Sequence, residues 1–458
     1  MSYSHTTWST AEDLLAGMLS DLQGSISKVR WPSAELQLHL AEALRTLQAL
    51  TGIYEATSEP FTVSASTAFV DLPTSVPPLR GQTLRDRDVI GPIQYALYEP
   101  YDPIDGTGMS EMFTFDQITK AVQRRRDRFL METLCQVTRT VTPTDPAVIT
   151  ADTESVELDE DTIAIVRAAW VDVGGPSGGL IGPLWPSSEW SARASSSRIT
   201  GAPGVPNSYV SGPRTPFSID LLPVPQSDGR LDLITVEAGA TLVPGTGSGT
   251  LLGIPDDFAP AIKWGALADL LSKDGPARDY ARSLFCERRY RMLVAAATAR
   301  GVLVDARVNS RSAFMTTLKG ADSGSPNWQS RSTDPRRGGM VIASVGLNLI
   351  ALISPPSVDC QMEVTVRRNA PVPTSGSSAL QIGKEWLDLL IGYAAHVAMF
   401  KIGGQEFAAS THLADSFFEA CADYNEELRV AWEGMMVDEP DEQKKAQGVR
   451  RVTGGTVQ

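Results

Sequence analysis

The chain has 458 residues, of which 42% are hydrophobic, and a formal net charge of −14. This length exceeds what one hydrophobic core usually organises, so two to four domains or layers are expected. The acidic balance argues against a general nucleic-acid coat, because neutralising phosphates requires an excess of Lys and Arg.

Cysteine usage and hydropathy indicate the compartment. The four cysteines are scattered and have no CxxC spacing, which favours buried free thiols in a reducing compartment over disulfides: Cys135, Cys286, Cys360 and Cys421. No run has the pattern of a signal peptide, and none is apolar for long enough to span a bilayer. We therefore expect a protein without a membrane anchor, synthesised in a cytoplasm.

The N-terminal third is predicted to be mainly helical. Apolar residues recur at helical spacing over residues 10–24 and 33–51, which predicts an N-terminal helical hairpin within residues 1–58. Residues 59–139 are expected to contain linker strands, within 61–72, and then a long helix over 116–139. Strand-like runs at 147–150, 155–158 and 163–173 predict a β-domain over residues 140–252, with a Ser/Pro/Gly-rich loop arm at 183–215.

The most regular stretch covers residues 216–299. Alternating runs at 217–222 and 230–236 flank a turn rich in Pro and Gly, which predicts two strands. Pro255, Asp256 and Asp257 then predict a helix start, because the first turn tolerates proline and the positive end of the helix dipole favours carboxylates. We expect a second helical hairpin over residues 253–302.

The same order of elements recurs nearer the C-terminus. Runs at 347–353 and 361–366 flank another proline turn, and helices are predicted over 381–401 and on to about 432. This self-similarity predicts an internal duplication of a β–αα unit. The second copy would comprise a loop arm and β-domain at 303–380 and a helical hairpin at 381–433, before a flexible charged tail at 434–458. The expected fold class is α+β, with helical hairpins and small antiparallel β-sandwich or barrel domains.

Motifs with catalytic or ligand-binding spacing are weak. The Gly-x-Ser-x-Gly spacing at 175–179 is not followed by a helix, and the glycine loop at 245–249 lacks a Walker lysine. Acidic residues at 102–106 lack the later ligands of a calcium loop. The histidines have no paired ligand spacing: His5, His39, His396 and His412. We therefore expect no enzymatic activity, no cofactor and no metal.

Two sets of residues are candidates for contacts. The first is a basic cluster on the predicted long helix, either a solvated face with ion pairs or a contact to a neighbouring subunit or to DNA in a channel: Arg124, Arg125, Arg126 and Arg128. Adjacent helical positions lie about 100° apart, so these four side chains cannot all face one way. The second set comprises aromatic packing or interface candidates in predicted helices: Trp264, Trp386, Tyr393 and Phe400.

Several packing motifs carry a resemblance. They are W-P-S-A-E-L at 31–36, R-F-L-M-E-T at 128–133, L-L-P-V-P at 221–225, I-P-D-D-F at 254–258, G-A-L-A-D-L-L at 265–271 and D-Y-A-R at 279–282. Their order over residues 10–299 resembles that of tailed-bacteriophage head–tail connector, adaptor or head-completion proteins; the C-terminal unit departs from that pattern. The resemblance implies a virion protein that forms a homo-oligomeric neck ring, twelvefold or sixfold, below the portal. Its other partners would be tail or collar proteins and the genome DNA, which passes without sequence-specific binding.

Other hypotheses predict different features. A collar, tail-tube or fibre- or spike-anchoring component would bind a partner or receptor through its β-domains, and a spike or fibre protein predicts exposed aromatic residues on strands and a trimer. A hydrolase of cell wall or capsule predicts two carboxylates, or a Ser/His pair, converging in a cleft.

Overall fold

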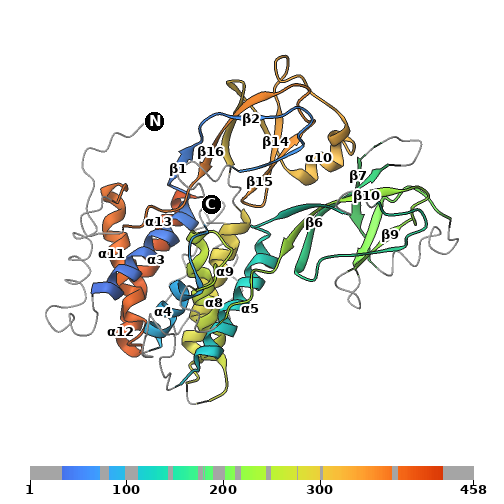
Figure 1. The fold of residues 1–458 in the computed structure, drawn as a ribbon. Helices are drawn as coiled ribbons and strands as arrows, with labels where there is room; N and C mark the ends of the chain where they lie inside the picture. The colour runs from blue at the N-terminus through green and yellow to red at the C-terminus, as the bar shows by residue number, and fades with distance from the viewer. Residues whose placement is uncertain are drawn as a thin grey trace, which may run out of the picture.

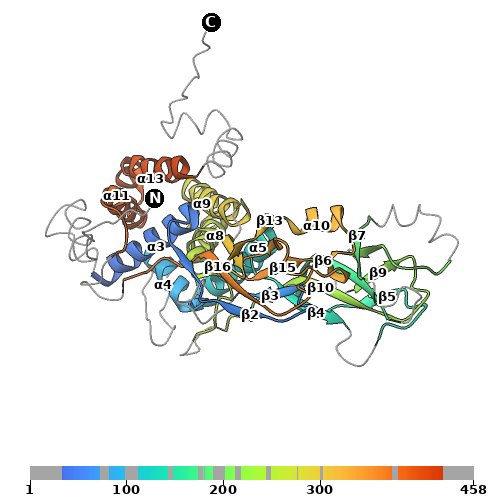
Figure 2. The same ribbon diagram turned by 90° about the horizontal axis from the view of Figure 1, so that it is seen from above.

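The computed structural model describes residues 33–72, 82–97, 112–142, 148–173, 179, 181–188, 202–211, 218–243, 249–275, 277–299, 303–373 and 380–425. The fold is mixed α+β, which confirms the predicted class. The helices gather on one side, one β-domain lies above them and a second extends sideways (Figure 1). Seen from above, both β-domains project from the same side of the helical group (Figure 2).

The helical group consists of two sets that pack against each other. One set contains α5 (Phe115–Thr133), α8 (Ala259–Ser272) and α9 (Tyr280–Ala299). The other contains α3 (Ser33–Thr51), α11 (Leu387–Met399) and α13 (Thr411–Tyr424), with the short α12 (Gly404–Ala409) between the last two. Helix α3 also contacts α8 and α9, and α4 (Asp86–Ala96) packs on α5 and α8. One large apolar core therefore spans both sets.

The β-domain that extends sideways is formed by seven consecutive strands, β4 to β10. We call it the nested domain, because the strands of the other β-domain, the enclosing domain, come before and after it in the sequence. The nested strands are β4 (Thr138–Thr142), β5 (Ser155–Glu157), β6 (Thr162–Asp172), β7 (Ile181–Pro186), β8 (Ser208–Ser211), β9 (Ser218–Leu222) and β10 (Gly229–Glu237). Their order in the sheet is β4-β10-β6-β7-β8-β9-β5. The sheet encloses a small core of its own, which includes Trp170, Leu231 and Leu233. Gly229 is needed there, because a Cβ would collide with the ring of Trp170.

The enclosing β-domain is built from two distant parts of the sequence. Its strands are β1 (Glu55–Thr57), β2 (Phe61–Val63), β3 (Phe69–Asp71), β11 (Leu303–Val308), β12 (Arg311–Ser312), β13 (Phe314–Thr316), β14 (Val341–Val345), β15 (Leu349–Ile353) and β16 (Cys360–Arg367). β1 and β2 pair with β16, and β3 pairs with β15. The strands predicted within residues 61–72 as part of a linker therefore belong to the β-domain predicted within residues 303–380.

The two β-domains have partly matching strand pairings. They differ because β6 pairs with β7 and joins the nested strands into one seven-stranded sheet, whereas the enclosing strands form a five-stranded and a four-stranded sheet. In the nested domain, β10 pairs antiparallel with β4 and β6, β7 runs parallel to β8, and β9 pairs antiparallel with β8 and β5. In the enclosing domain, β16 pairs antiparallel with β1, β2 and β11, β13 runs parallel to β14, and β15 pairs antiparallel with β14 and β3. A short 3-10 turn then leads into a helix in each case: η2 (Asp256–Phe258) before α8 and η4 (Lys384–Trp386) before α11.

Several elements differ from their predicted extent. The long helix ends at Thr133 rather than 139, because Leu134 adopts a left-handed conformation and β4 follows. Helix α4 was not predicted, since its Pro92 and polar first turn are not typical of a helix interior. The segment predicted as a loop arm after residue 303 contains α10 (Leu318–Gly324) and η3 (Trp328–Ser330). The first predicted helix, the tail from 434 and much of the 183–215 arm lie outside the described residues.

The I-P-D-D-F motif at the start of α8 forms hydrogen bonds with two other segments of the chain. Asp256 Oδ1 accepts hydrogen bonds from the backbone N–H groups of Thr83 and Leu84, at 2.8 and 3.0 Å. Asp257 accepts one from the N–H of Ala370, at 3.0 Å. The two carboxylates therefore hold the approach to α4 and the segment after β16 against the start of α8. The aspartates of the motif therefore have a structural role.

Candidate functional site

The described residues contain no group of three or more His, Cys, Asp or Glu side chains arranged to hold a metal ion. The four cysteines are free and buried, as predicted. Burial raises the pKa of the Cys286 thiol, so it stays protonated and unreactive. Among the helices in the described ranges, none combines the length and the hydropathy that crossing a bilayer requires.

The described histidines do not form a metal-ligating group. His39 is buried in α3, with Nε2 3.3 Å from Glu35 Oε1, and His412 is exposed on α13. His396 is buried in α11, with Nδ1 2.9 Å from Ser410 Oγ. That Ser/His pair lacks access for a substrate, and the serine hydroxyl donates to the carbonyl of Phe407 instead. His5 and the motifs at 102–106, 175–178 and 245–248 lie outside the described residues.

The arginine cluster on α5 is divided between the interior and the surface. The side chains of Arg125 and Arg126 are only 8% and 0% exposed. Arg125 pairs with Asp269 of α8 and Glu287 of α9, and Arg126 donates to the carbonyls of Gly239 and Ala240. These two arginines therefore hold their own chain together and cannot share one surface patch with the others.

The remaining two arginines are partly exposed. Arg124 pairs with Asp269 at 2.6 Å, and Arg128 pairs with Glu132 at 2.7 Å. Burial raises the pKa of Asp269, but hydrogen bonds from Arg125 and Arg124 outweigh it, so the net pKa is lowered. Only Arg124 and Arg128 remain candidates for a contact with a neighbouring subunit or with DNA, and that role stays a prediction.

The four aromatic candidates are buried; Trp264 and Phe400 join the two helix sets, whereas Tyr393 and Trp386 contact α13 within their own set. Trp264 of α8 packs edge-on against Phe400, which follows α11, with ring centroids 5.2 Å apart. Tyr393 stacks on Phe417 of α13 at 4.4 Å, and Trp386 contacts Tyr424 at 6.0 Å. The predicted packing role is therefore what the structure shows, and these rings have no exposed face to offer another molecule.

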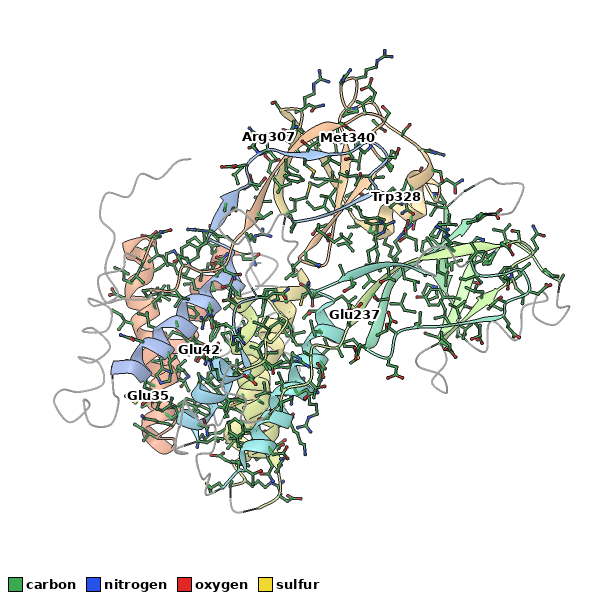
Figure 3. All side chains as sticks on the ribbon, in the orientation of Figure 1. Glu35, Glu42, Glu237, Arg307, Trp328 and Met340 are labelled. Atoms are coloured by element: carbon green, nitrogen blue, oxygen red, sulfur yellow. The ribbon has the colours of Figure 1, made fainter. Side chains whose placement is uncertain are left out.

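Buried ion pairs also join α3 to the other helices. Lys401, after α11, donates to both carboxylate oxygens of Glu35 at 2.7 Å, and Lys263 of α8 pairs with Glu42. Both glutamates lie along α3 (Figure 3). Burial raises the pKa of Glu35, but its hydrogen bonds with His39 and Lys401 outweigh it and the net pKa is lowered. These pairs were not predicted from the sequence, although the spacing of Glu35, His39 and Glu42 on one helical face indicates them.

A second buried polar network joins the two β-domains. Arg167 of β6 pairs with Asp322 of α10 at 2.9 and 3.1 Å, and the indole of Trp328 donates to the same carboxylate at 2.8 Å. Gln329 donates to Asp232 of β10, which also pairs with Arg139 of β4. Trp328 lies on the side of the enclosing domain that faces the nested domain (Figure 3). No local pattern in the sequence indicates this network, since its members come from five separate elements.

Among the described residues, each β-domain has one exposed aromatic side chain on a strand of its parallel pair. Trp185 of β7 is 41% exposed and its neighbour in the ladder is Ser208. Phe314 of β13 is 66% exposed and its neighbour is Val341. β13 lies at the edge of its sheet, and the adjacent Met315 is also exposed. These apolar groups are candidates for contacts with another molecule.

Comparison with protein-family models and with curated proteins found no match to this chain. The features on which a function can rest are two β-domains with partly matching strand pairings, two helix sets, and an exposed aromatic side chain on a described strand of each β-domain. The buried charges described above join parts of the chain to one another.

Proposed function

We propose that this chain is a structural virion protein of a tailed bacteriophage, which forms a ring in the neck and connects the portal and head to the tail. The observation that carries this proposal is the repetition of one strand arrangement in two domains that contact each other through different surfaces. Such a head-to-tail contact can continue from one copy to the next and close into a ring. The ring would leave the genome DNA free to pass through its channel.

We also infer that the two domains belong to duplicated units. The nested unit comprises α5, the nested β-domain, α8 and α9, and the enclosing unit comprises α3, the enclosing β-domain and α11 to α13. Helices α3 and α5 each have 19 residues and precede the first strand of their unit. The matching pairings support the β–αα duplication predicted from sequence and extend it by this preceding helix.

The motifs that resemble neck proteins support the same proposal. L-L-P-V-P lies at the turn between β9 and β10, I-P-D-D-F at the start of α8 and G-A-L-A-D-L-L within α8. All three belong to the framework of the nested unit. A resemblance in framework motifs is what shared architecture would produce, because these residues determine packing rather than chemistry.

The proposal is tested by measuring the native mass of the purified chain and imaging it by negative stain, alone and mixed with the portal protein of the same phage. We expect rings of six or twelve subunits, alone or on the portal. A stable trimer, or a chain that neither assembles nor binds the portal, would contradict the neck proposal.

The exposed aromatic residues favour one second candidate, a component that anchors a fibre or spike or binds a receptor. Trp185 and Phe314 lie on strands, where flat rings can stack on a sugar or on another protein. This candidate predicts a trimer whose receptor binding is lost in W185A and F314A. Rings that form equally well with both substitutions, and that bind no receptor, would exclude it.

A further inference from the structure

The turns at one end of each β-domain are closed by corresponding hydrogen bonds. In the nested domain, the N–H of Gly204 donates to the carbonyl of Val224 at 2.8 Å, and in the enclosing domain the N–H of Thr333 donates to that of Pro355 at 2.9 Å. The carbonyls of Gly204 and Thr333 each accept an N–H from the residue two positions after Val224 or Pro355, at 3.0 and 2.9 Å. Gly204 and Thr333 therefore occupy corresponding positions.

The enclosing domain has a longer connection after this position. The next strands, β8 and β14, start at Ser208 and Val341 and pair in the same register with β9 and β15. Three residues separate Gly204 from Ser208, whereas seven separate Thr333 from Val341. The enclosing domain thus has four additional residues within 334–340, which the nested domain does without. A loop that the framework does not require is free to serve a contact with another molecule.

This longer loop presents a basic patch, which we define as the exposed side chains of Arg311, Arg336 and Arg337. Arg311 Nη1 donates to the carbonyl of Arg336 at 3.0 Å, so its guanidinium lies beside the loop. The side chain of Arg337 is 89% exposed and pairs with Asp334 at 3.4 Å. The exposed ring of Phe314 lies against the end of the same loop. Three guanidinium groups therefore gather around one carboxylate.

The nested domain carries the opposite charge at another place. Six of the ten residues 152–161 are acidic and exposed, and we call them the acidic segment: Asp152, Glu154, Glu157, Asp159, Glu160 and Asp161. The segment includes β5, which lies at an edge of the nested sheet. It contains no Lys or Arg, so its charges are not balanced locally.

The start of the acidic segment has a neutral counterpart in the enclosing domain. The N–H of Asp152 donates to the carbonyl of Pro225 at 2.9 Å, and the N–H of Ser66 donates to that of Pro356 at 2.8 Å. Pro225 and Pro356 each lie three residues after the end of β9 or β15, so Ser66 corresponds to Asp152. Two residues further on, an alanine corresponds to Glu154. Each β-domain therefore carries charges that the other lacks, and the two sets have opposite signs.

The two charged sets do not pair within the chain. In the part of the chain that the structure describes, no ion pair or hydrogen bond joins the basic patch to the acidic segment. A head-to-tail contact between copies brings a surface of one copy against a different surface of the next. Opposite charges on the two β-domains can therefore meet between copies.

We propose that the basic patch of one copy binds the acidic segment of the next copy in the ring. This inference rests on the proposed neck ring and adds the surfaces that form it. A guanidinium group binds a carboxylate through two parallel hydrogen bonds, and complementary charges select the partner and its register. Double-stranded DNA carries a charge about every 1.7 Å along its axis, so a stable contact with it needs a longer basic surface than three arginines. A short acidic protein segment is the better match.

Reversal of the charges tests this contact. Full-length chains carry Arg336→Glu with Arg337→Glu, or Asp159→Lys with Glu160→Lys, or all four substitutions. Sedimentation over a range of concentrations, alone and with the portal, measures assembly. We expect each pair to weaken assembly by about tenfold, and the four together to restore most of it, because opposite charges face each other again. The substituted residues are exposed, so each variant should keep the thermal transition of the wild type.

A matched control makes the same change of charge elsewhere. Lys273→Glu with Arg278→Glu, on the exposed turn between α8 and α9, should assemble as the wild type does. Normal assembly of R336E/R337E would overturn this contact and leave the neck proposal standing, and weaker binding of that variant to a DNA duplex would then assign the patch to DNA. Loss of assembly that the four substitutions do not restore would overturn the acidic segment as the partner. A wild-type chain that does not assemble, alone or on the portal, would overturn both proposals.

A cross-link locates the contact directly. Arg336→Lys with Arg337→Lys keeps the charge and supplies amines, which a carbodiimide couples to carboxylates that they touch. Equal amounts of this variant with natural nitrogen and with ¹⁵N are assembled together and treated. We expect peptides that join residue 336 or 337 of one isotope to residues 152–161 of the other. Arg278→Lys is the control and should give no such peptide, and assembled rings of R336K/R337K without it would overturn the contact.

Discussion

At the scale of single residues, His396 is a buried group whose protonation opposes folding. Its ring lies 4.8 Å from that of Phe407 and 5.5 Å from that of Phe285. Ser410 donates its hydroxyl proton to a carbonyl, so His396 Nδ1 carries the hydrogen and donates to Ser410 Oγ, while buried Nε2 has no partner. Burial, aided by the charge of Arg289, lowers the pKa of His396 to about 3. The imidazole is therefore neutral in the folded protein.

This environment predicts a loss of stability in acid. The unfolded chain takes up a proton on His396 below its ordinary pKa of 6.5, and the folded chain does so only near 3. The free energy of unfolding should therefore fall between these values, by about 1.4 kcal/mol per pH unit from this residue. We expect His396→Phe, which keeps an aromatic ring, to flatten that slope in denaturant titrations from pH 7.5 to 4. An unchanged slope in H396F would contradict the assignment.

At the scale of elements, α8 is the helix around which its set packs. It carries Trp264, Lys263 and Asp269, which join it to α11, α3 and α5 respectively. Gly265 allows the close approach of its neighbours, because a Cβ there would lie 2.9 Å from Cδ of Arg125 and from the ring of Tyr290. A glycine in the middle of a helix is therefore explained here by packing.

A larger side chain at this position should force the helices apart. We expect Gly265→Val to lower the free energy of unfolding by about 1–3 kcal/mol, the usual cost of overpacking a core. Ser272→Val, at the exposed end of the same helix, tests the effect of valine alone and should change stability much less. Urea denaturation followed by circular dichroism measures both. Equal stability of G265V and the wild type would show that α8 can shift without cost.

At the scale of the whole molecule, the two β-domains are held together by buried charges. Arg167 and Asp322 face each other across the boundary, and the remaining hydrogen-bonding capacity of Asp322 is used by Trp328. Removal of one partner from a buried pair leaves a charge without compensation, whereas replacement of both by apolar side chains is often nearly neutral. The network therefore controls whether the domains unfold as one unit.

This distinction gives a prediction for calorimetry. Arg167→Met should destabilise the protein by about 3–5 kcal/mol and separate one thermal transition into two, as the β-domains lose their contact. The double substitution with Asp322→Leu should recover part of the loss, because it removes the uncompensated carboxylate but also the acceptor of the Trp328 indole N–H. Arg337→Met, on an arginine whose side chain is 89% exposed, is the control. A single unchanged transition in R167M would show that apolar contacts alone hold the domains.

Helices and strands were easier to predict from the sequence than the partners of individual side chains. The helix starting at Pro255 and the strands around the two proline turns were predicted because capping and period-2 alternation are local properties. Helix α4 was missed, since Pro92 lies inside it and a proline there usually breaks a helix. The prediction that Arg125 and Arg126 are exposed was wrong. The sequence of the helix alone could not show this, because their partners Asp269, Glu287 and Gly239 lie more than a hundred residues away.

By itself, the sequence determined the mixed α+β class, most helices, the free buried thiols and the recurrence of strand, proline turn, strand and helix, all of which depend on residues close together in the chain. Only the tertiary structure decided that β1 and β2 join the sheet of β16 and that β3 joins the sheet of β15, about three hundred residues later, so that one β-domain is nested within the other in the sequence. It also decided which strand faces are covered. Pairing and burial depend on contacts between distant segments, whose stability is collective and leaves no periodic mark in either segment.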